Sequence, residues 1–194
     1  MNEALIPALQ AEAAWCIWQP SRQQAAFRQL MTAFSYPGRV VPLASGAESA
    51  HMLVLATLSD SACALADPQR LLSSDDMRRL GVRAGSVETS EFVLTAGGCT
   101  LEVSPRLGSL ENPEQGATVI LQVSSLDAGT QLQLTGPGIA SDQLLQVGGV
   151  DPNWWKQRSE WNGHFPLGVD LILVAKHEVA VLPRTTHITF KGAH

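Results

Sequence analysis

Apolar residues along the chain follow two spacings, one typical of helices and one typical of strands. The helical spacing predicts helices over residues 20–35, 47–58, 73–80 and 151–161, and a shorter one over 139–147. The first helix starts at Pro20-Ser21 and ends before Pro37-Gly38, because a proline disfavours helical backbone before it. That helix is expected to bury one stripe, formed by Phe27, Leu30, Met31 and Phe34.

The second spacing predicts short strands, which become more frequent toward the C-terminus. They are expected over residues 39–43, 62–66, 91–95, 117–123, 131–135, 169–174, 178–182 and 186–190. Short links favour two hairpins, one through residues 124–130 and one through Lys176-His177. Helices interleaved with strands predict an α/β protein with a mixed β-sheet flanked by helices.

Length and composition narrow the class further. We expect an N-terminal arm over residues 1–19 and a single domain over residues 20–194. Charged residues are only 16% of the chain, against about 25% in an average protein, which favours broad buried sheet faces or a large partner interface. A net charge of −5 without a basic run argues against nucleic-acid binding. Without a signal peptide or an apolar run of about 18 residues, a cytoplasmic protein with no membrane contact is expected.

The motifs of common cofactor and metal sites do not occur in this sequence. Gly136-Pro137-Gly138 lacks the third glycine of a dinucleotide fingerprint and is interpreted as a turn. The histidines and cysteines lack metal-ligand spacing, so no metal is predicted. Lys176 follows a buried strand, where a lysine can form a Schiff base with pyridoxal phosphate, but a solvated turn lysine is favoured and no cofactor is predicted. All three cysteines are expected to be small buried side chains: Cys16, Cys63 and Cys99.

Polar residues gather in the apolar stretch from residue 164 to 189. Asp170 begins a buried strand, and a buried carboxylate requires a partner, for which Arg184 is the candidate. This pair has two interpretations. The favoured one is a structural tie between two loops. In the other, Arg184 and Thr185 hold an oxyanion and His187 assists proton transfer, which makes these residues and Asp170 the catalytic candidates.

Two further groups of residues leave alternatives open. Arg28 and Arg39 flank the Ser35–Gly38 turn and either bind phosphate or an acidic partner, or are solvated surface arginines. Tryptophans 154, 155 and 161 fall on one predicted helix beside Arg158. That helix presents either a partner-binding face, since Trp and Arg dominate interface hot spots, or part of the core.

Several motifs, in order over residues 20–190, resemble one protein family. They are Phe27-Arg28 with Met31, Pro37-Gly38, residues 116–123, residues 134–139, residues 165–173 (FPLGVDLIL) and residues 183–187 (PRTTH). The last two together are the most specific. On these residues the chain resembles the PhnH family, whose members are components of the bacterial carbon–phosphorus lyase complex.

The resemblance implies a fold, partners and a pathway. The fold is expected to be similar to the large domain of pyridoxal-phosphate-dependent transferases, without the cofactor or its lysine. The family forms homodimers and joins the components of the complex that are called G, I and J. With G, I and the ATPase-like component called L, it is required to move the ribose triphosphate of ATP onto an alkylphosphonate. The resemblance supplies no catalytic residue.

Three hypotheses follow. In the first, the chain is an accessory subunit of the alpha-D-ribose 1-methylphosphonate 5-triphosphate synthase complex, with no activity alone. In the second, it contributes catalytic residues to that transferase and contacts ATP or phosphonate. The third, a free-standing pyridoxal transferase, is the least favoured of the three.

Overall fold

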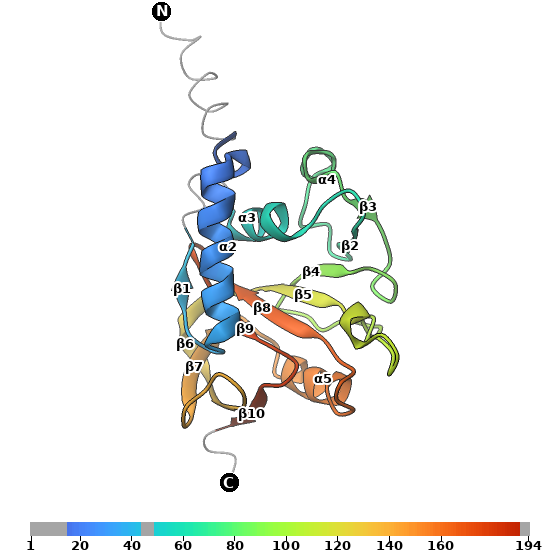
Figure 1. The fold of residues 1–194 in the computed structure, drawn as a ribbon. Helices are drawn as coiled ribbons and strands as arrows, with labels where there is room; N and C mark the ends of the chain where they lie inside the picture. The colour runs from blue at the N-terminus through green and yellow to red at the C-terminus, as the bar shows by residue number, and fades with distance from the viewer. Residues whose placement is uncertain (1–14, 44–48, 191–194) are drawn as a thin grey trace, which may run out of the picture.

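The computed structural model describes residues 15–43 and 49–190 (Figure 1). The expected arm over residues 1–19 lies outside this range except for η1 (Trp15–Trp18). Helices form close to where the sequence predicts them, apart from the one expected over 139–147. They are α2 (Pro20–Ser35), α3 (Ala50–Leu58), α4 (Ser74–Leu80) and α5 (Asn153–Trp161). The short η2 (Pro113–Gln115) was not predicted.

Helix α2 buries a narrower face than its apolar spacing predicts. Its buried residues are Ala26, Leu30 and Ala33. Phe27 and Met31 were expected in the stripe, but they are 49% and 52% exposed. The reason is the face that α2 turns toward α3 and β9: it packs through Ala26, Leu30 and Ala33, and the residues one position further along, Phe27 and Met31, lie at the surface.

A seven-stranded sheet forms the centre of the molecule, in the order β1-β9-β8-β5-β4-β2-β3. Strands β3, β2, β4, β5 and β8 are parallel to one another, and β9 is antiparallel to β8 and to β1. The strands are β1 (Val41–Pro42), β2 (Ala64–Ala66), β3 (Arg83–Ala84), β4 (Phe92–Ala96), β5 (Thr118–Gln122), β8 (Asp170–Val174) and β9 (Glu178–Leu182). The mixed sheet and the β8–β9 hairpin are as predicted.

A second, antiparallel sheet has the order β10-β6-β7. It consists of β6 (Ser125–Thr135), β7 (Gln143–Gly148) and β10 (His187–Phe190). Two predictions are wrong here. β5 does not form a hairpin with the following strand, because its buried apolar residues pair with β4 and β8 on both sides. The helix expected over 139–147 is replaced by β7, whose buried Leu145 and Val147 alternate in the strand period.

The two faces of the large sheet are covered differently (Figure 1). One face packs its apolar residues, such as Ile120 and Ile172, against α2, α3 and α4. The other face packs residues such as Val119 and Leu171 against the small sheet and α5. The mixed α/β class is therefore confirmed, but the second face is covered by a sheet and one helix where helices were expected.

Two of the open questions on side chains are answered by burial. Trp154, Trp155 and Trp161 lie in the core, and the rings of Trp154 and Trp161 meet edge to face at 5.9 Å. Their helix face is thus core and not a partner surface. The cysteine prediction is wrong for Cys99, which is exposed after the Gly97-Gly98 turn, and Cys63 is only half-buried. The side chain of Cys16 lies outside the described residues.

Candidate functional site

The sheet brings several chain segments together at the carboxyl ends of its central parallel strands. Gln122, the last residue of β5, is in register with Val174, the last residue of β8. Strand β1 is antiparallel to β9, which is antiparallel to β8, so β1 also points to this edge. Helix α3 follows β1 and therefore begins here. Open α/β sheets bind their ligands at this kind of edge.

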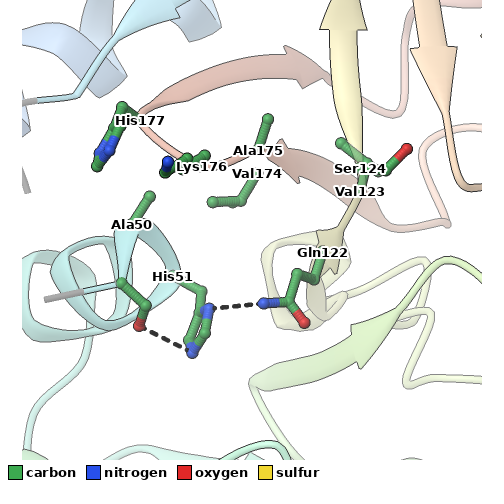
Figure 2. A pocket seen from close by; sticks show the side chains of 10 residues that line it. Ala50, His51, Gln122, Val123, Ser124, Val174, Ala175, Lys176 and His177 are labelled. Carbon is green, nitrogen blue, oxygen red and sulfur yellow. Dashed lines mark hydrogen bonds between the residues drawn. The ribbon is translucent and has the colours of Figure 1, made fainter.

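A cavity of about 460 Å³ lies at this edge, and we call it the sheet-end cavity. Its volume is within the range of small-molecule sites. Figure 2 shows side chains from α3, from the end of β5 and from the β8–β9 turn around it. The lining residues are Ser49, Ala50, His51, Gln122, Val123, Ser124, Val174, Ala175, Lys176 and His177.

His51 is the buried polar residue of the sheet-end cavity, with 8% of its surface exposed. The side-chain amide nitrogen of Gln122 lies 3.3 Å from Nδ1, and Oγ of Ser49 lies 3.0 Å from Nε2. An amide nitrogen only donates, so Nδ1 accepts and the network assigns the ring proton to Nε2, which donates to Ser49. Burial lowers the pKa of His51 below 6.5, although Asp67 and Asp76 oppose the shift. The ring is therefore a neutral hydrogen-bonding group at pH 7.

The bond from His51 to Ser49 changes how helix α3 begins. Ser49 is the N-cap residue, but its side chain makes no capping hydrogen bond. In α4, by contrast, Ser73 and Asp76 form a capping box in which each side chain accepts a backbone N–H. The first turn of a helix has N–H groups without intrahelical acceptors. At α4 some of them are occupied by its own side chains, whereas Ser49 leaves those of α3 to other acceptors.

Among the described residues that line the sheet-end cavity, the charged side chain is the positive Lys176. Lys176 is exposed in the two-residue turn between β8 and β9, as the favoured interpretation predicts, and His177 follows it. The ten lining residues in the described part of the chain include no Asp or Glu. An ammonium group, two hydroxyl groups and the positive end of a helix dipole suit a ligand that carries negative charge.

The predicted pair of Asp170 and Arg184 forms at the opposite end of β8. Nη2 of Arg184 lies 2.9 Å from Oδ2 of Asp170, and the backbone N–H of Arg184 donates to Oδ1 at 2.8 Å. Nη1 donates to the carbonyls of Pro113 and Pro166. The side chains of Arg184 and Asp170 are only 14% and 22% exposed. The guanidinium thus joins three loops through groups of the protein itself.

The other residues of that cluster do not converge on one point. Arg184 and His187 line a second cavity of about 620 Å³ with the buried Arg158, whereas Thr185 is not among its lining residues. His187 is exposed at the start of β10. Arg158 donates to the carbonyls of Pro183 and Thr186, and burial lowers its pKa to about 10. These contacts fix the chain around Arg184.

The two surface arginines do not share a site with the cluster. Arg28 is exposed on α2. Arg39 stacks over the ring of Tyr36 at 5.6 Å and lines a third cavity of about 410 Å³ near Asp142. None of the three cavities that we describe includes both arginines. Neither arginine is placed beside Arg184 in the described part of the chain.

Sequence reasoning missed most of the sheet-end cavity. His51, Gln122 and Ser124 come from segments far apart in the sequence. Only Gln122 lies in a motif that carries the family resemblance, and nothing in that motif singles it out. The available signal was positional: a serine before a helix and polar residues directly after two buried strands. Metal binding has no support in residues 15–43 and 49–190, where no group of three or more His, Cys, Asp or Glu residues is placed to hold an ion. No helix in those ranges is long and apolar enough to cross a membrane.

The fold and the cavity define the class: a mixed α/β protein with a ligand-sized cavity at the carboxyl edge of a mostly parallel sheet. The chain belongs to the family described as bacterial phosphonate metabolism protein (PhnH), whose model matches residues 16–189.

Two curated relatives are similar over most or all of their length. The putative C-P lyase subunit protein HtxG of Stutzerimonas stutzeri is 73% identical over 194 residues, covering 100% of both chains. The alpha-D-ribose 1-methylphosphonate 5-triphosphate synthase subunit PhnH of Rhizobium meliloti (strain 1021) is 27% identical over 178 residues, covering 85% of this chain and 89% of the relative. The predicted family is therefore confirmed.

Proposed function

We propose that the chain is an accessory subunit of a bacterial carbon–phosphorus lyase system. It would be required for transfer of the ribose triphosphate of ATP to an alkylphosphonate, without performing the chemistry itself. The observation that carries the proposal is the full-length similarity, 73% identical, to a protein named as a C-P lyase subunit. The name of the second relative supports the transferase step.

The geometry of Arg184 supports an accessory role over a catalytic one. Its guanidinium already donates to Asp170 and to two loop carbonyls, so binding an oxyanion would break contacts that join three loops. A charge that is paired inside the protein costs several kcal/mol to unpair. Arg184, Thr185, His187 and Asp170 therefore support the structural interpretation, and the catalytic role remains the alternative.

Assembly with partners is supported by the exposed face of α2. Phe27 and Met31 are one helical turn apart, both half-exposed, with Arg28 beside them. An aromatic residue, a methionine and an arginine are the residue types enriched in interfaces. We propose this face as a contact in a homodimer or with the lyase components G, I or J. A fold similar to the large domain of pyridoxal-phosphate-dependent transferases and a cytoplasmic location remain part of the proposal.

The test of the proposal is a reconstituted reaction. The lyase components G, I and L are mixed with ATP and methylphosphonate, and adenine release is measured with and without this chain. The proposal expects release only when the chain is present, and none from the chain alone. Equal release without it would overturn the proposal.

Two variants separate the accessory role from the catalytic alternative. His187→Ala should keep both assembly and turnover if the chain is accessory, and the exposed His164→Ala is its matched control. Lost turnover with intact assembly would support the catalytic alternative.

The α2 contact is tested by copurification. Met31→Glu should reduce recovery with the partner proteins or the apparent mass in size-exclusion chromatography. Leu110→Glu, at a residue that is 75% exposed outside this face, should leave both unchanged. If the two variants behave alike, α2 is not the contact.

A further inference from the structure

We propose that the sheet-end cavity binds the phosphate group of a small phosphorylated molecule. This goes beyond the proposed function and stands without it, because a chain that binds a phosphate ester need not be a lyase subunit. The shared chemistry is a phosphate or polyphosphate group on a small organic body. An inorganic phosphate, a sugar phosphate and a nucleoside triphosphate are sources that the experiment distinguishes.

The first support is the combination of volume and composition. A cavity of about 460 Å³ has room for a phosphate group and for an organic part attached to it. Its lining combines the apolar Val123, Val174 and Ala175 with polar residues. Apolar surface with a few polar groups can orient a ligand that has one charged end.

The second support is a cation that no group among the described residues neutralises. Within the described residues, Lys176 makes no ion pair or hydrogen bond, and no carboxylate lines the cavity beside it. The turn that carries it is held on both sides. Leu43 donates its N–H to the carbonyl of His177 at 2.7 Å, and Ala175 donates to the carbonyl of Glu178 at 3.0 Å. The backbone that carries the Lys176 side chain beside the cavity is therefore fixed.

The third support is the start of helix α3, which adds to the cavity and the lysine. Ala50 and His51 line the cavity, and backbone N–H groups of a first helical turn bind phosphate well. Ser49 does not cap them, because its hydroxyl accepts the proton on Nε2 of His51. Gln122 holds the other ring nitrogen (Figure 2). We interpret His51 as a positioning residue, which turns Ser49 away from the helix end.

The second cavity is the rival location for a phosphate group, since it contains more cationic residues. Its two arginines, however, already donate to protein carbonyls, and Arg184 is also paired with Asp170. Lys156 is the lysine on that cavity's lining. It therefore offers a matched control for Lys176 and a direct test of the rival.

The test is titration of the isolated, isotopically labelled full chain, followed by two-dimensional amide NMR and by calorimetry. The probes are inorganic phosphate, tripolyphosphate, ribose 5-phosphate and ATP, with ribose and adenosine as uncharged controls. We expect at least one phosphorylated probe to bind. The amide shifts should centre on Ala50, His51, Ser124 and Lys176, while ribose and adenosine leave the spectrum unchanged.

The variants make the proposal falsifiable. Lys176→Ala should weaken binding about tenfold, the size of effect for losing one hydrogen bond to a charged group. Lys156→Ala should leave it unchanged. Lys176→Gln is a second variant that removes the charge but keeps a polar end on a slightly shorter side chain, and the amide spectrum of each variant shows whether it is folded.

Three results would overturn the proposal. One is no binding of any phosphorylated probe. Another is a shift pattern centred on α5 and β10 that Lys156→Ala abolishes. The third is equal affinity for adenosine and ATP, which would mean that the base and not the phosphate is recognised. Failure of the transferase reaction would leave all three readouts meaningful, because they need only this chain.

Discussion

Strand β8 has a polar cluster at each end, and the two clusters use their polar groups in opposite ways. At its start, Asp170 and Arg184 satisfy each other and the surrounding carbonyls. At its finish, Lys176 stands beside a cavity whose described lining contains no carboxylate. The comparison teaches that density of polar residues in a sequence does not identify a binding site. What matters is whether the polar groups already form hydrogen bonds and ion pairs within the protein.

The largest expected effect tests the start of β8. Arg184→Ala leaves Asp170 without its partner and three loops without their common donor, and it should lower the free energy of unfolding by about 3 kcal/mol. Urea unfolding measures it. The control is Arg78→Ala, which breaks a surface ion pair with Asp75 and should cost less than about 1 kcal/mol. Similar losses of unfolding free energy in the two variants would contradict a structural role for the Asp170–Arg184 pair.

A glycine beside Arg184 provides a second test of how tightly the loops at the start of β8 pack. A Cβ added at Gly116 would lie 2.3 Å from the carbonyl oxygen of Gly168 and about 3 Å from the Arg184 guanidinium. Gly116→Ala should therefore cost about 2 kcal/mol in unfolding experiments. At Gly98 an added Cβ meets nothing within 4 Å, so Gly98→Ala is the control and should stay within about 0.5 kcal/mol. A tolerated Gly116→Ala would mean that the loops have room to move apart.

The next prediction compares the two helix starts. Ser73→Ala removes the capping box of α4 and should cost about 1 kcal/mol. Ser49→Ala removes no cap of α3, so its effect on the free energy of unfolding should be clearly smaller. Chemical denaturation of both variants decides this. A larger loss at Ser49 would show that its bond to His51 matters more for stability than a cap.

The smallest expected effect concerns pH. Burial lowers the pKa of His51 below its unfolded value of 6.5, so the unfolded chain binds more protons in this range. The contribution of neutral His51 to the free energy of unfolding is complete above pH 6.5 and falls as the pH drops below that value. It levels off below the pKa of His51 in the folded protein. His51→Asn should therefore lose less stability between pH 7.5 and pH 5 than the unaltered chain.

The sequence allowed the class and most of the elements to be predicted, because long apolar runs and helix starts are local signals. The strand over residues 169–174 is an example. The Asp170–Arg184 pair could be predicted from it, because a carboxylate in an apolar strand requires a partner. The prediction failed where partners decide the structure. Residues 143–148 have a spacing compatible with a helix, and pairing with β6 makes them a strand. Phe27 and Met31 fit an apolar stripe, yet the helix packs through the neighbouring Ala26, Leu30 and Ala33.

The sheet-end cavity could not be predicted for a different reason. Its residues are ordinary in their local context: a histidine in an apolar helix, a glutamine at the end of a strand and a lysine in a turn. They become a site only because β1, β5 and β8 end at one edge of the sheet. No local pattern in the sequence records that arrangement.

The position of β1 in the sheet has a consequence for synthesis of the chain. Val41 pairs with Val179, far along the sequence, so β1 remains without its partner until β9 has been synthesised. The cavity, which spans residues 49 to 177, is completed equally late. Pairing between such distant segments is slow because a long loop must close first. Nascent chains are therefore expected to expose the unpaired β1 until β9 is made. Chaperones that bind unpaired strand edges are expected to act on the chain at this stage.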